Sequence, residues 1–270
     1  MNLLEKMWRF NKLNPTFDNI NDRNILIVGA SSGIGYALAE LLEKNNSNVF
    51  VMARRGSLLE KRFIKQNVFQ VDVTSSDEIE FFFNEIEKRN LCIDTVFWCP
   101  GIYTPMSFKD FDVEEANQIL NTNFSCVFKP FSLMTKYWLK NKELFNEKSI
   151  HWVWISSVAG YRGLPGAVAY GPSKAAMNNL AEASYIEMKP LGINISLVCP
   201  GFVESRLTEK NNFKMPALIT TDEAASRILS GLKDGKFEIH FPKRFTIWLK
   251  LFNILPDWLY FRIMKSIQKS

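Results

Sequence analysis

Histidine and cysteine are scarce in this 270-residue chain, which limits the metal and redox chemistry it can carry. The two histidines are His151 and His240, and the four cysteines form no Cys-x-x-Cys pair. Zinc-ligand spacing is absent, and so is the Gly-x-Ser-x-Gly elbow of hydrolases. We expect no metal, a reducing, cytoplasmic location and buried, reduced thiols. These thiols are Cys92, Cys99, Cys126 and Cys199.

Long apolar runs and charge of one sign are also missing. No run of about 18 apolar residues occurs, so no membrane-spanning helix is expected. Charged residues interrupt residues 1–10, unlike a secretory signal. The net charge is +5, and residues 243–270 hold six basic residues against one acid, which leaves the remainder neutral. A neutral body argues against a nucleic-acid-binding protein.

Apolar, strand-like runs alternate with amphipathic helical patterns along most of the chain. This alternation predicts an α/β fold, a doubly wound Rossmann-type parallel sheet of about seven strands with helices on both faces. We expect a single domain over residues 1–270, with a core at about 22–242, an amphipathic extension at 1–21 and a basic, aromatic extension at 243–270. Strands are expected at 24–28, 48–53, 68–71, 95–99, 151–156, 194–199 and 237–241, and helices at 34–44, 57–65, 77–89, 112–140, 169–188 and 220–233.

A glycine-rich turn directly follows the first expected strand. It reads Gly29-Ala30-Ser31-Ser32-Gly33-Ile34-Gly35 and leads into an amphipathic helix. Glycines let the backbone turn tightly and approach a pyrophosphate, while the helix amino end offers free N–H groups. The turn therefore predicts dinucleotide binding beyond the carboxyl ends of the strands, with a plain strand–helix loop as the alternative.

Tyr170 and Lys174 stand four residues apart at the start of an expected helix, so they share one face. A nearby ammonium group favours the phenolate and lowers a phenol pKa from its usual value of about 10. The pair therefore suits a tyrosine general acid, although ordinary amphipathic packing is the alternative. Pro172 is tolerable only in the first helical turn, which puts Tyr170 at the helix entrance.

These segments, in this order, resemble the single-domain branch of the short-chain dehydrogenase/reductase family. The glycine-rich turn is similar to the family's Thr-Gly-x-x-x-Gly-x-Gly, with Val28 where threonine is usual. Ser157 matches the catalytic serine better than Ser156, because it stands 13 residues before the tyrosine. In the expected mid-chain helix, Asn123 is the best match to the family's catalytic asparagine, and Asn121 is the fallback. The implied catalytic residues are Asn123, Ser157, Tyr170 and Lys174.

The resemblance also implies roles for these residues. Ser157 would hydrogen-bond the substrate carbonyl oxygen, Asn123 would hold a water in the proton relay, and Lys174 would also hold the nicotinamide ribose. One departure is Trp98-Cys99-Pro100-Gly101 where the family has Asn-Asn-Ala-Gly, so asparagine contacts to the cofactor are lost in that turn.

The stretch after the second expected strand, Met52-Ala53-Arg54-Arg55, indicates the cofactor. NAD enzymes place there an acid that accepts from the ribose hydroxyl, whereas this stretch has two guanidinium groups, which suit a 2′-phosphate. We expect NADP(H). The resemblance adds Asp72 beside the adenine, for which a turn or helix cap is the alternative, and Pro200 to Ser205 beside the nicotinamide. The expected cofactor-binding residues are Gly29, Ser31, Ser32, Gly33, Ile34, Gly35, Arg54, Arg55, Asp72, Val73, Gly101, Tyr170, Lys174, Pro200, Gly201, Val203 and Ser205.

The implied function is hydride transfer between NADP(H) and a carbonyl or alcohol substrate. A non-catalytic NADP(H)-binding sensor or scaffold module is the alternative. The apolar residues of an expected lid at 204–217 and its flanks suggest an apolar substrate, although such residues would equally pack the lid itself. Ketoacyl thioesters, retinoids, sterols and aryl ketones all stay open. Family practice implies a homodimer or homotetramer paired through the helices at 112–140 and 169–188. The apolar residues of the lid region are Phe202, Leu207, Phe213, Met215 and Leu218.

The two terminal extensions combine apolar and basic residues at helical spacing. Residues 243–270 have a wide apolar arc, which Pro256 divides into two helices. Either the extension packs on the body or a neighbouring subunit, or it is an interfacial anchor on an anionic membrane. The amino end repeats the pattern with Leu3, Leu4, Met7 and Trp8 beside Lys6 and Arg9.

Overall fold

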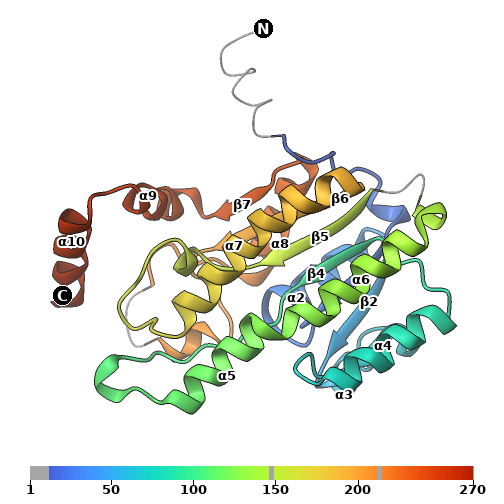
Figure 1. Cartoon of the computed structure of the whole chain (residues 1–270), viewed down its shortest axis with the longest axis horizontal. Coiled ribbons are helices and arrows are strands. Elements are labelled where there is room, and N and C mark those ends of the chain that lie inside the picture. Colours follow the sequence, from blue (N-terminus) through green and yellow to red (C-terminus); the bar gives the residue numbers. More distant parts are fainter. Residues whose placement is uncertain (1–11, 146–148, 212–214, 270) are drawn as a thin grey trace, which may run out of the picture.

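One parallel sheet organises the computed structural model, which describes residues 12–145, 149–211 and 215–269 (Figure 1). Its seven strands run in the order β3-β2-β1-β4-β5-β6-β7. Strands β2 and β3 are added on one side of β1 and strands β4 to β7 on the other, so the order of the strands switches between β1 and β4. The expected doubly wound sheet is confirmed. The strands are β1 (Asn24–Val28), β2 (Asn48–Ala53), β3 (Val68–Gln70), β4 (Thr95–Trp98), β5 (Ile150–Ile155), β6 (Ile193–Pro200) and β7 (Glu238–Phe241).

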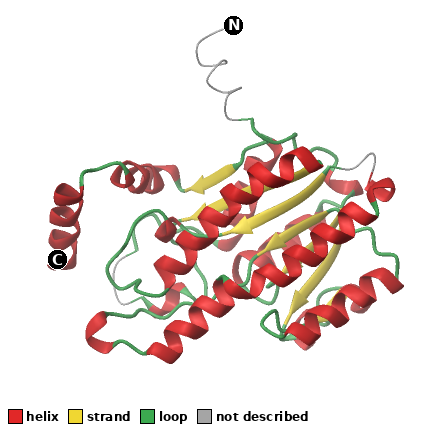
Figure 2. Ribbon diagram, viewed as in Figure 1, coloured by secondary structure: helices red, strands yellow, loops and turns green. Residues whose placement is uncertain are grey.

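Helices cover both faces of the sheet (Figure 2). Successive side chains of a strand point to opposite faces, so Ile25 and Ile27 join one core while Leu26 and Val28 join the other. The first core packs against α2 and α8, and the second against α4, α6 and α7. The helices of these two layers are α2 (Gly33–Lys44), α3 (Gly56–Leu59), α4 (Ser76–Lys88), α5 (Val113–Asn123), α6 (Phe128–Lys140), α7 (Tyr170–Met188) and α8 (Thr221–Lys233).

The expected helix over 112–140 is wrong as a single element. Asp112 caps it as expected, accepting a hydrogen bond from the Glu115 N–H at 3.0 Å. The helix then ends at Asn123, because Phe124 adopts φ −137° and ψ −62°, and a short 3-10 turn precedes α6. The break falls where the Asn123 side chain is drawn into contacts with the loop after β4, described below.

The expected helix at 57–65 is also shorter than its pattern indicated. It stops at Leu59, and the chain then turns so that Phe63 is buried. In the same turn the Arg62 guanidinium bonds Glu40 and Glu43 of α2 at 3.1 and 2.7 Å. Tertiary contacts thus override local helix propensity here.

Two further helices, α9 (Lys243–Asn253) and α10 (Asp257–Lys269), follow the last strand. They lie at the end of the molecule toward which the strands point, at the left in Figure 1. Among the described residues, no helix is both long and apolar enough to cross a membrane. The same residues hold no cluster of histidine, cysteine or acidic side chains that could bind a metal ion.

Candidate active site

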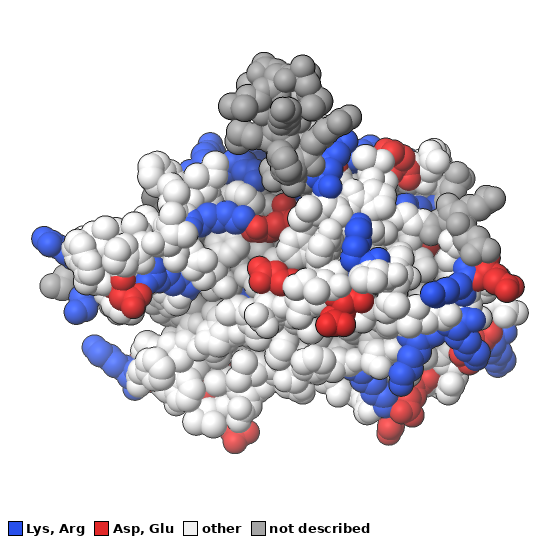
Figure 3. All heavy atoms as spheres, turned by 45° about the horizontal axis from the view of Figure 1, so that its top comes forward, with Lys and Arg blue, Asp and Glu red and all other residues white. Residues whose placement is uncertain are grey.

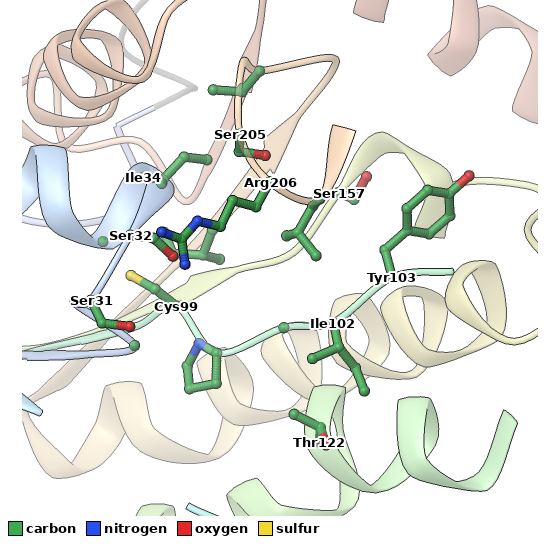
Figure 4. Close-up of a pocket in the computed structure, with 18 of the residues that line it drawn as sticks. Ser31, Ser32, Ile34, Cys99, Ile102, Tyr103, Thr122, Ser157, Ser205 and Arg206 are labelled. Carbon is green, nitrogen blue, oxygen red and sulfur yellow. The ribbon is translucent and has the colours of Figure 1, made fainter. Parts of the chain in front are cut away.

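A cavity of about 710 Å³ opens at the carboxyl ends of the strands. Loops after β1, β2, β3, β4, β5 and β6 all contribute to its wall, so segments far apart in sequence meet here (Figure 4). All expected cofactor-binding residues line it, as do Ser157, Tyr170 and Lys174. The buried Asn123 stands directly behind the wall. Neither His151 nor His240 lines it; each bonds a neighbouring hydroxyl, Ser196 and Thr246 respectively.

The glycine-rich turn brings bare backbone to one end of this cavity. Gly29 has φ +79°, and a Cβ there would lie 2.9 Å from the Pro100 nitrogen. A Cβ on Gly35 would lie 2.6 Å from the Gly29 oxygen. Side chains are therefore excluded by packing at both positions. Ser32 precedes α2 and, within the described part of the chain, makes no side-chain capping bond, so the first N–H groups of α2 are available to an anion.

The two serines that end β5 have different partners. Ser156 Oγ donates to the Lys174 carbonyl at 3.2 Å and to Asn178 Oδ1 at 2.5 Å, which fixes it against α7. Ser157 Oγ accepts from the Ala159 N–H at 3.1 Å and is hydrogen-bonded with Tyr170. Ser157 is thus the serine that can share a substrate oxygen with the tyrosine.

Asn123 and Lys174 face the same small space beside Gly101. A Cβ built on Gly101 would lie 3.6 Å from Lys174 Nζ and 3.7 Å from Asn123 Oδ1. Asn123 Oδ1 accepts from the Ile102 N–H at 2.7 Å, and its Nδ2 donates to the Ile102 carbonyl at 3.0 Å and to Ser173 Oγ at 3.1 Å. The side chain therefore ties the loop after β4 to α7. Asn121, the fallback, is exposed on the opposite side.

Burial dominates the acid–base properties of the tyrosine–lysine pair. It raises the pKa of Tyr170 to about 12, and the hydrogen bond with Ser157 offsets part of that effect. Burial likewise lowers the pKa of Lys174 to about 8. Lys174 Nζ lies 5.8 Å from the centre of the Tyr170 ring and donates to the Ile155 carbonyl at 3.1 Å. At neutral pH Tyr170 is consequently a protonated phenol beside a mostly charged lysine, an arrangement suited to donating a proton.

Two arginines border the far end of the cavity. Arg55 donates to Ser31 Oγ of the glycine-rich turn at 3.1 Å. Arg54 is largely exposed and lies 3.9 Å from an Asp72 oxygen. The other oxygen of Asp72 accepts from the N–H and hydroxyl of Thr74 at 2.9 and 2.7 Å, which is the turn role considered above. The guanidinium groups of Arg54 and Arg55 thus both lie at the end of the cavity formed by the glycine-rich turn.

The loop after β4, which departs from the family pattern, still packs closely against the glycine-rich turn. Cys99 continues the sheet by donating its N–H to the Val28 carbonyl at 3.0 Å, and Pro100 packs on Gly29. Burial raises the pKa of the Cys99 thiol to about 12, so this thiol is a neutral wall of the cavity. Trp98 points away from the cavity into the core, where it stacks on Trp152 with ring centres 5.8 Å apart.

Several cavity residues were missed by motif reasoning. Arg206 extends its guanidinium across the cavity in the direction of Ser32 (Figure 4). Tyr103 packs edge-on against Tyr170 with ring centres 5.0 Å apart, and its hydroxyl bonds Asn211 at 3.0 Å. Lys210 bonds the Tyr103 carbonyl at 3.0 Å, so the lid segment is tied to the loop after β4. The other lining residues that no motif predicted are Val71, Ile102, Thr122, Ile155 and Thr208. Ala53, Cys99, Pro100, Ser156 and Leu207 also line the cavity, and they belong to the motifs and the lid expected from the sequence.

Comparison with known proteins identifies the class to which this fold and site belong. The short chain dehydrogenase family model matches residues 23–216. The chain therefore belongs to the short-chain dehydrogenase family of oxidoreductases, which confirms the resemblance drawn from the motifs.

Individual relatives extend over most of the chain. An uncharacterized oxidoreductase of Myxococcus xanthus is 29% identical over 245 residues, which are 88% of this chain and 94% of that protein. A 3beta-hydroxysteroid dehydrogenase of Mediterraneibacter gnavus is 30% identical over 206 residues, 71% of this chain and 70% of that protein. A crystal structure of a short chain dehydrogenase from Burkholderia cenocepacia J2315 in complex with NADP has a TM-score of 0.76 at 18% identity, covering 90% of this chain and 98% of that one. The last likeness supports the fold.

Proposed function

We propose that this protein is an NADP(H)-dependent oxidoreductase that interconverts a carbonyl and an alcohol on an apolar substrate. One observation carries the proposal: a single cavity joins the bare-backbone turn and two arginines at one end to Ser157, Tyr170 and Lys174 at the other. A bound dinucleotide would supply the hydride. The protein would supply orientation, a proton and charge.

The polar residues near Tyr170 would each act on the substrate oxygen, the tyrosine or the loop after β4. Ser157 Oγ and the Tyr170 hydroxyl would hold the carbonyl oxygen as it gains negative charge. Tyr170 would donate its proton to that oxygen. Lys174 would stabilise the phenolate that remains and contact the nicotinamide ribose. Asn123, through its bonds to Ile102 and Ser173, would hold the loop after β4 in a fixed position relative to α7, which carries Lys174.

The cavity residues fit a phosphorylated dinucleotide. Packing leaves no room for a side chain at Gly29 or Gly35, so the backbone of the turn could approach the dinucleotide closely. The uncapped amino end of α2 would then hold the pyrophosphate. Arg54 and Arg55 suit an additional 2′-phosphate. The solved Burkholderia relative holds NADP, which supports the same choice here. Gly101, Pro200 and Val203 would border the nicotinamide.

An apolar substrate is favoured by the walls near Tyr170. Ile102, Tyr103 and Leu207 line the cavity there, and the relative from Mediterraneibacter gnavus is named for a hydroxysteroid. Of the expected lid residues, Phe213 lies outside the described part of the chain.

The test is oxidation of NADPH with a panel of carbonyls, from small aryl ketones to sterols and long-chain ketoacyl thioesters, followed at the nicotinamide absorbance. We expect turnover to rise with apolar size. Tight NADPH binding without turnover of any member would instead support the alternative, a non-catalytic sensor or scaffold module.

The pH dependence follows from the two shifted groups. Tyr170, with a pKa of about 12, stays protonated through the working range. Lys174 loses its charge as pH rises through about 8, so carbonyl reduction should decline above that pH. The measurement is kcat/KM against pH for the wild type and Lys174→Arg. The falling limb should move to higher pH in the variant, and an unmoved limb would assign it to another group.

Assembly is expected through the helices on one face of the sheet. Val113, Phe128 and Ile186 on α5, α6 and α7 are large apolar side chains that are at least half exposed. We propose that these helices pair two copies as a homodimer or a dimer of dimers. Sedimentation velocity at about micromolar concentration should show no monomer boundary, while Ile186→Glu should release monomers.

A further inference from the structure

The helices α9 and α10 are fixed to the body by one face only. Tyr260 and Met264 of α10 are 2% and 8% exposed, and Thr246 of α9 is fully buried. Phe245 of α9 packs on Gly201, where a Cβ would lie 3.0 Å from its ring, and on Phe202. The placement of both helices is therefore set by packing on the site loops.

Arg162 locks the junction between the two helices. It donates to the Phe252 and Leu255 carbonyls at 2.7 Å each, and its other nitrogen pairs with Asp257. Its guanidinium also lies 4.0 Å from the centre of the Tyr260 ring, and the Tyr260 hydroxyl bonds the Gly163 carbonyl. Arg162 belongs to the segment that connects Ser157 to Tyr170, so the helix pair is attached to the catalytic loop itself.

The opposite face of the pair is apolar and exposed. Six large side chains there are each 44–78% exposed. An apolar patch of this size on a soluble surface usually marks an interaction site. The six residues are Ile247, Trp248, Leu251, Ile254, Trp258 and Phe261; they are called the outer face below.

Basic residues flank the outer face. Arg244 precedes it on α9, and Arg262 and Lys265 follow it on α10, all three exposed. In the space-filling view this end of the molecule is mostly white with blue side chains along its edge (Figure 3). Residues 243–270 hold six basic residues and one acid, Asp257, so this segment accounts for the whole net charge of +5. Asp257 is paired with Arg162 and Lys250 with Glu238 of β7, whereas the three flanking basic residues are exposed.

We infer that the outer face binds the surface of an anionic lipid bilayer. Tryptophan and aliphatic side chains would enter the boundary between headgroups and acyl chains, while the three basic residues meet lipid phosphates and carboxylates. A second copy on the same face would, in a two-fold pairing, bring identical cationic rims together. Anionic lipid neutralises them, so charge complementarity favours the membrane.

The position of the outer face gives the contact a role in substrate entry. The loop after β4 carries Phe108 and Phe111, which are 82% and 42% exposed. In Figure 1 this loop, which leads into α5, and α10 lie at the end toward which the strands point. The loops at these strand ends line the cavity. A bilayer bound there would meet the substrate entrance, which suits an apolar substrate. This last step rests on the proposed function; the lipid contact does not.

The test uses full-length protein and sedimentation with phosphatidylcholine vesicles, plain or with about a third phosphatidylserine. We expect binding to the anionic vesicles that weakens between about 0.05 and 0.5 M salt. Trp248→Ser with Trp258→Ser should weaken partitioning by at least about tenfold, because two interfacial anchors are lost. Phe81→Ser with Ile64→Ser is the matched control, since those side chains are 67% and 60% exposed elsewhere, and it should bind as the wild type does.

A second readout reports orientation without depending on activity. Lipids with brominated acyl chains should quench part of the wild-type tryptophan fluorescence and quench it less in the Trp248/Trp258 variant, whose thermal transition should stay that of the wild type. The inference is overturned if intact protein ignores anionic vesicles at low salt, or if both double variants lose binding equally. It is also overturned if the tryptophan variant changes only the sedimentation of the free protein, because the outer face is then a protein interface.

Discussion

Tyr170→Phe should reduce carbonyl turnover by about two orders of magnitude or more while leaving the NADPH dissociation constant nearly unchanged. The ring stays in its place against Tyr103, so packing is preserved. In the proposed mechanism the variant would lack the proton donor and one of the two hydrogen bonds to the substrate oxygen, and a positioned general acid contributes about 100-fold or more. Single-turnover kinetics with saturating NADPH would measure the loss, and fluorescence titration would measure binding.

A neighbouring phenol supplies the control for this variant. Tyr103 also lines the cavity, but its hydroxyl is engaged by Asn211 at 3.0 Å. Tyr103→Phe should therefore retain most of the turnover. Equal losses in both variants would mean that the cavity needs two phenols for packing or solvation, and that Tyr170 is not the specific proton donor.

The acid–base state of the site differs from what the sequence indicates. The spacing of Tyr170 and Lys174 predicts a phenol pKa lowered by the ammonium group, whereas burial raises it to about 12. Burial also lowers the pKa of Lys174 to about 8. Desolvation depends on the loops that close over both groups, which a motif does not reveal. The raised value keeps the Tyr170 phenol protonated at neutral pH, which is the state that a proton donor needs before it reacts.

The sheet could be predicted from the sequence because its signals are local. Each buried parallel strand is a short apolar run bounded by turn residues, and the caps at Asp112 and Thr220 are visible as spaced side chains. The break at Phe124 could not be predicted in this way. It follows from the bonds between Asn123, Ile102 and Ser173, which join segments 21 and 50 residues away along the chain.

Some residues of the site could likewise be predicted from their spacing in the sequence, and others could not. Ser157 could be distinguished from Ser156 by its spacing to the tyrosine, and the structure supplies the physical difference, since Ser156 is held by α7. Arg206, Tyr103 and Lys210 have no recognisable spacing, because lid residues acquire roles only when the loops after β4 and β6 meet. Arg206 stands five residues after Gly201, inside the expected lid, and no motif includes it.

The C-terminal helices combine residues packed on the body with an exposed apolar arc, so packing does not rule out the membrane interpretation. The apolar arc of residues 243–270 is too wide for a surface helix, and packing on the body was one explanation of it. The body covers only the side that includes Tyr260 and Met264. The remaining arc, with Trp248 and Trp258, stays exposed and keeps the membrane hypothesis open to test.

Arg54→Ala combined with Arg55→Ala should weaken NADPH binding by about 100-fold and NADH binding by no more than about threefold. A charge-assisted hydrogen bond contributes about 1.5–3 kcal/mol, and a tenfold change corresponds to about 1.4 kcal/mol. Two guanidinium groups on one phosphate therefore account for at least two orders of magnitude. NADH has no 2′-phosphate, so it loses only the contact of Arg55 with the turn at Ser31.

A nearby arginine that lies outside the cavity supplies the control for this prediction. Arg62→Ala removes a nearby arginine that bonds Glu40 and Glu43 on α2, outside the cavity, and should change neither dissociation constant. Equal weakening of NADPH and NADH in the double variant would mean that the arginines support the turn instead of reading the phosphate. Tighter binding of NADH than NADPH by the wild type would overturn the cofactor assignment outright. In that case Asp72, which is bonded to Thr74 and lies 3.9 Å from Arg54, becomes the next residue to substitute, because it is the acidic residue among the described residues that line the cavity.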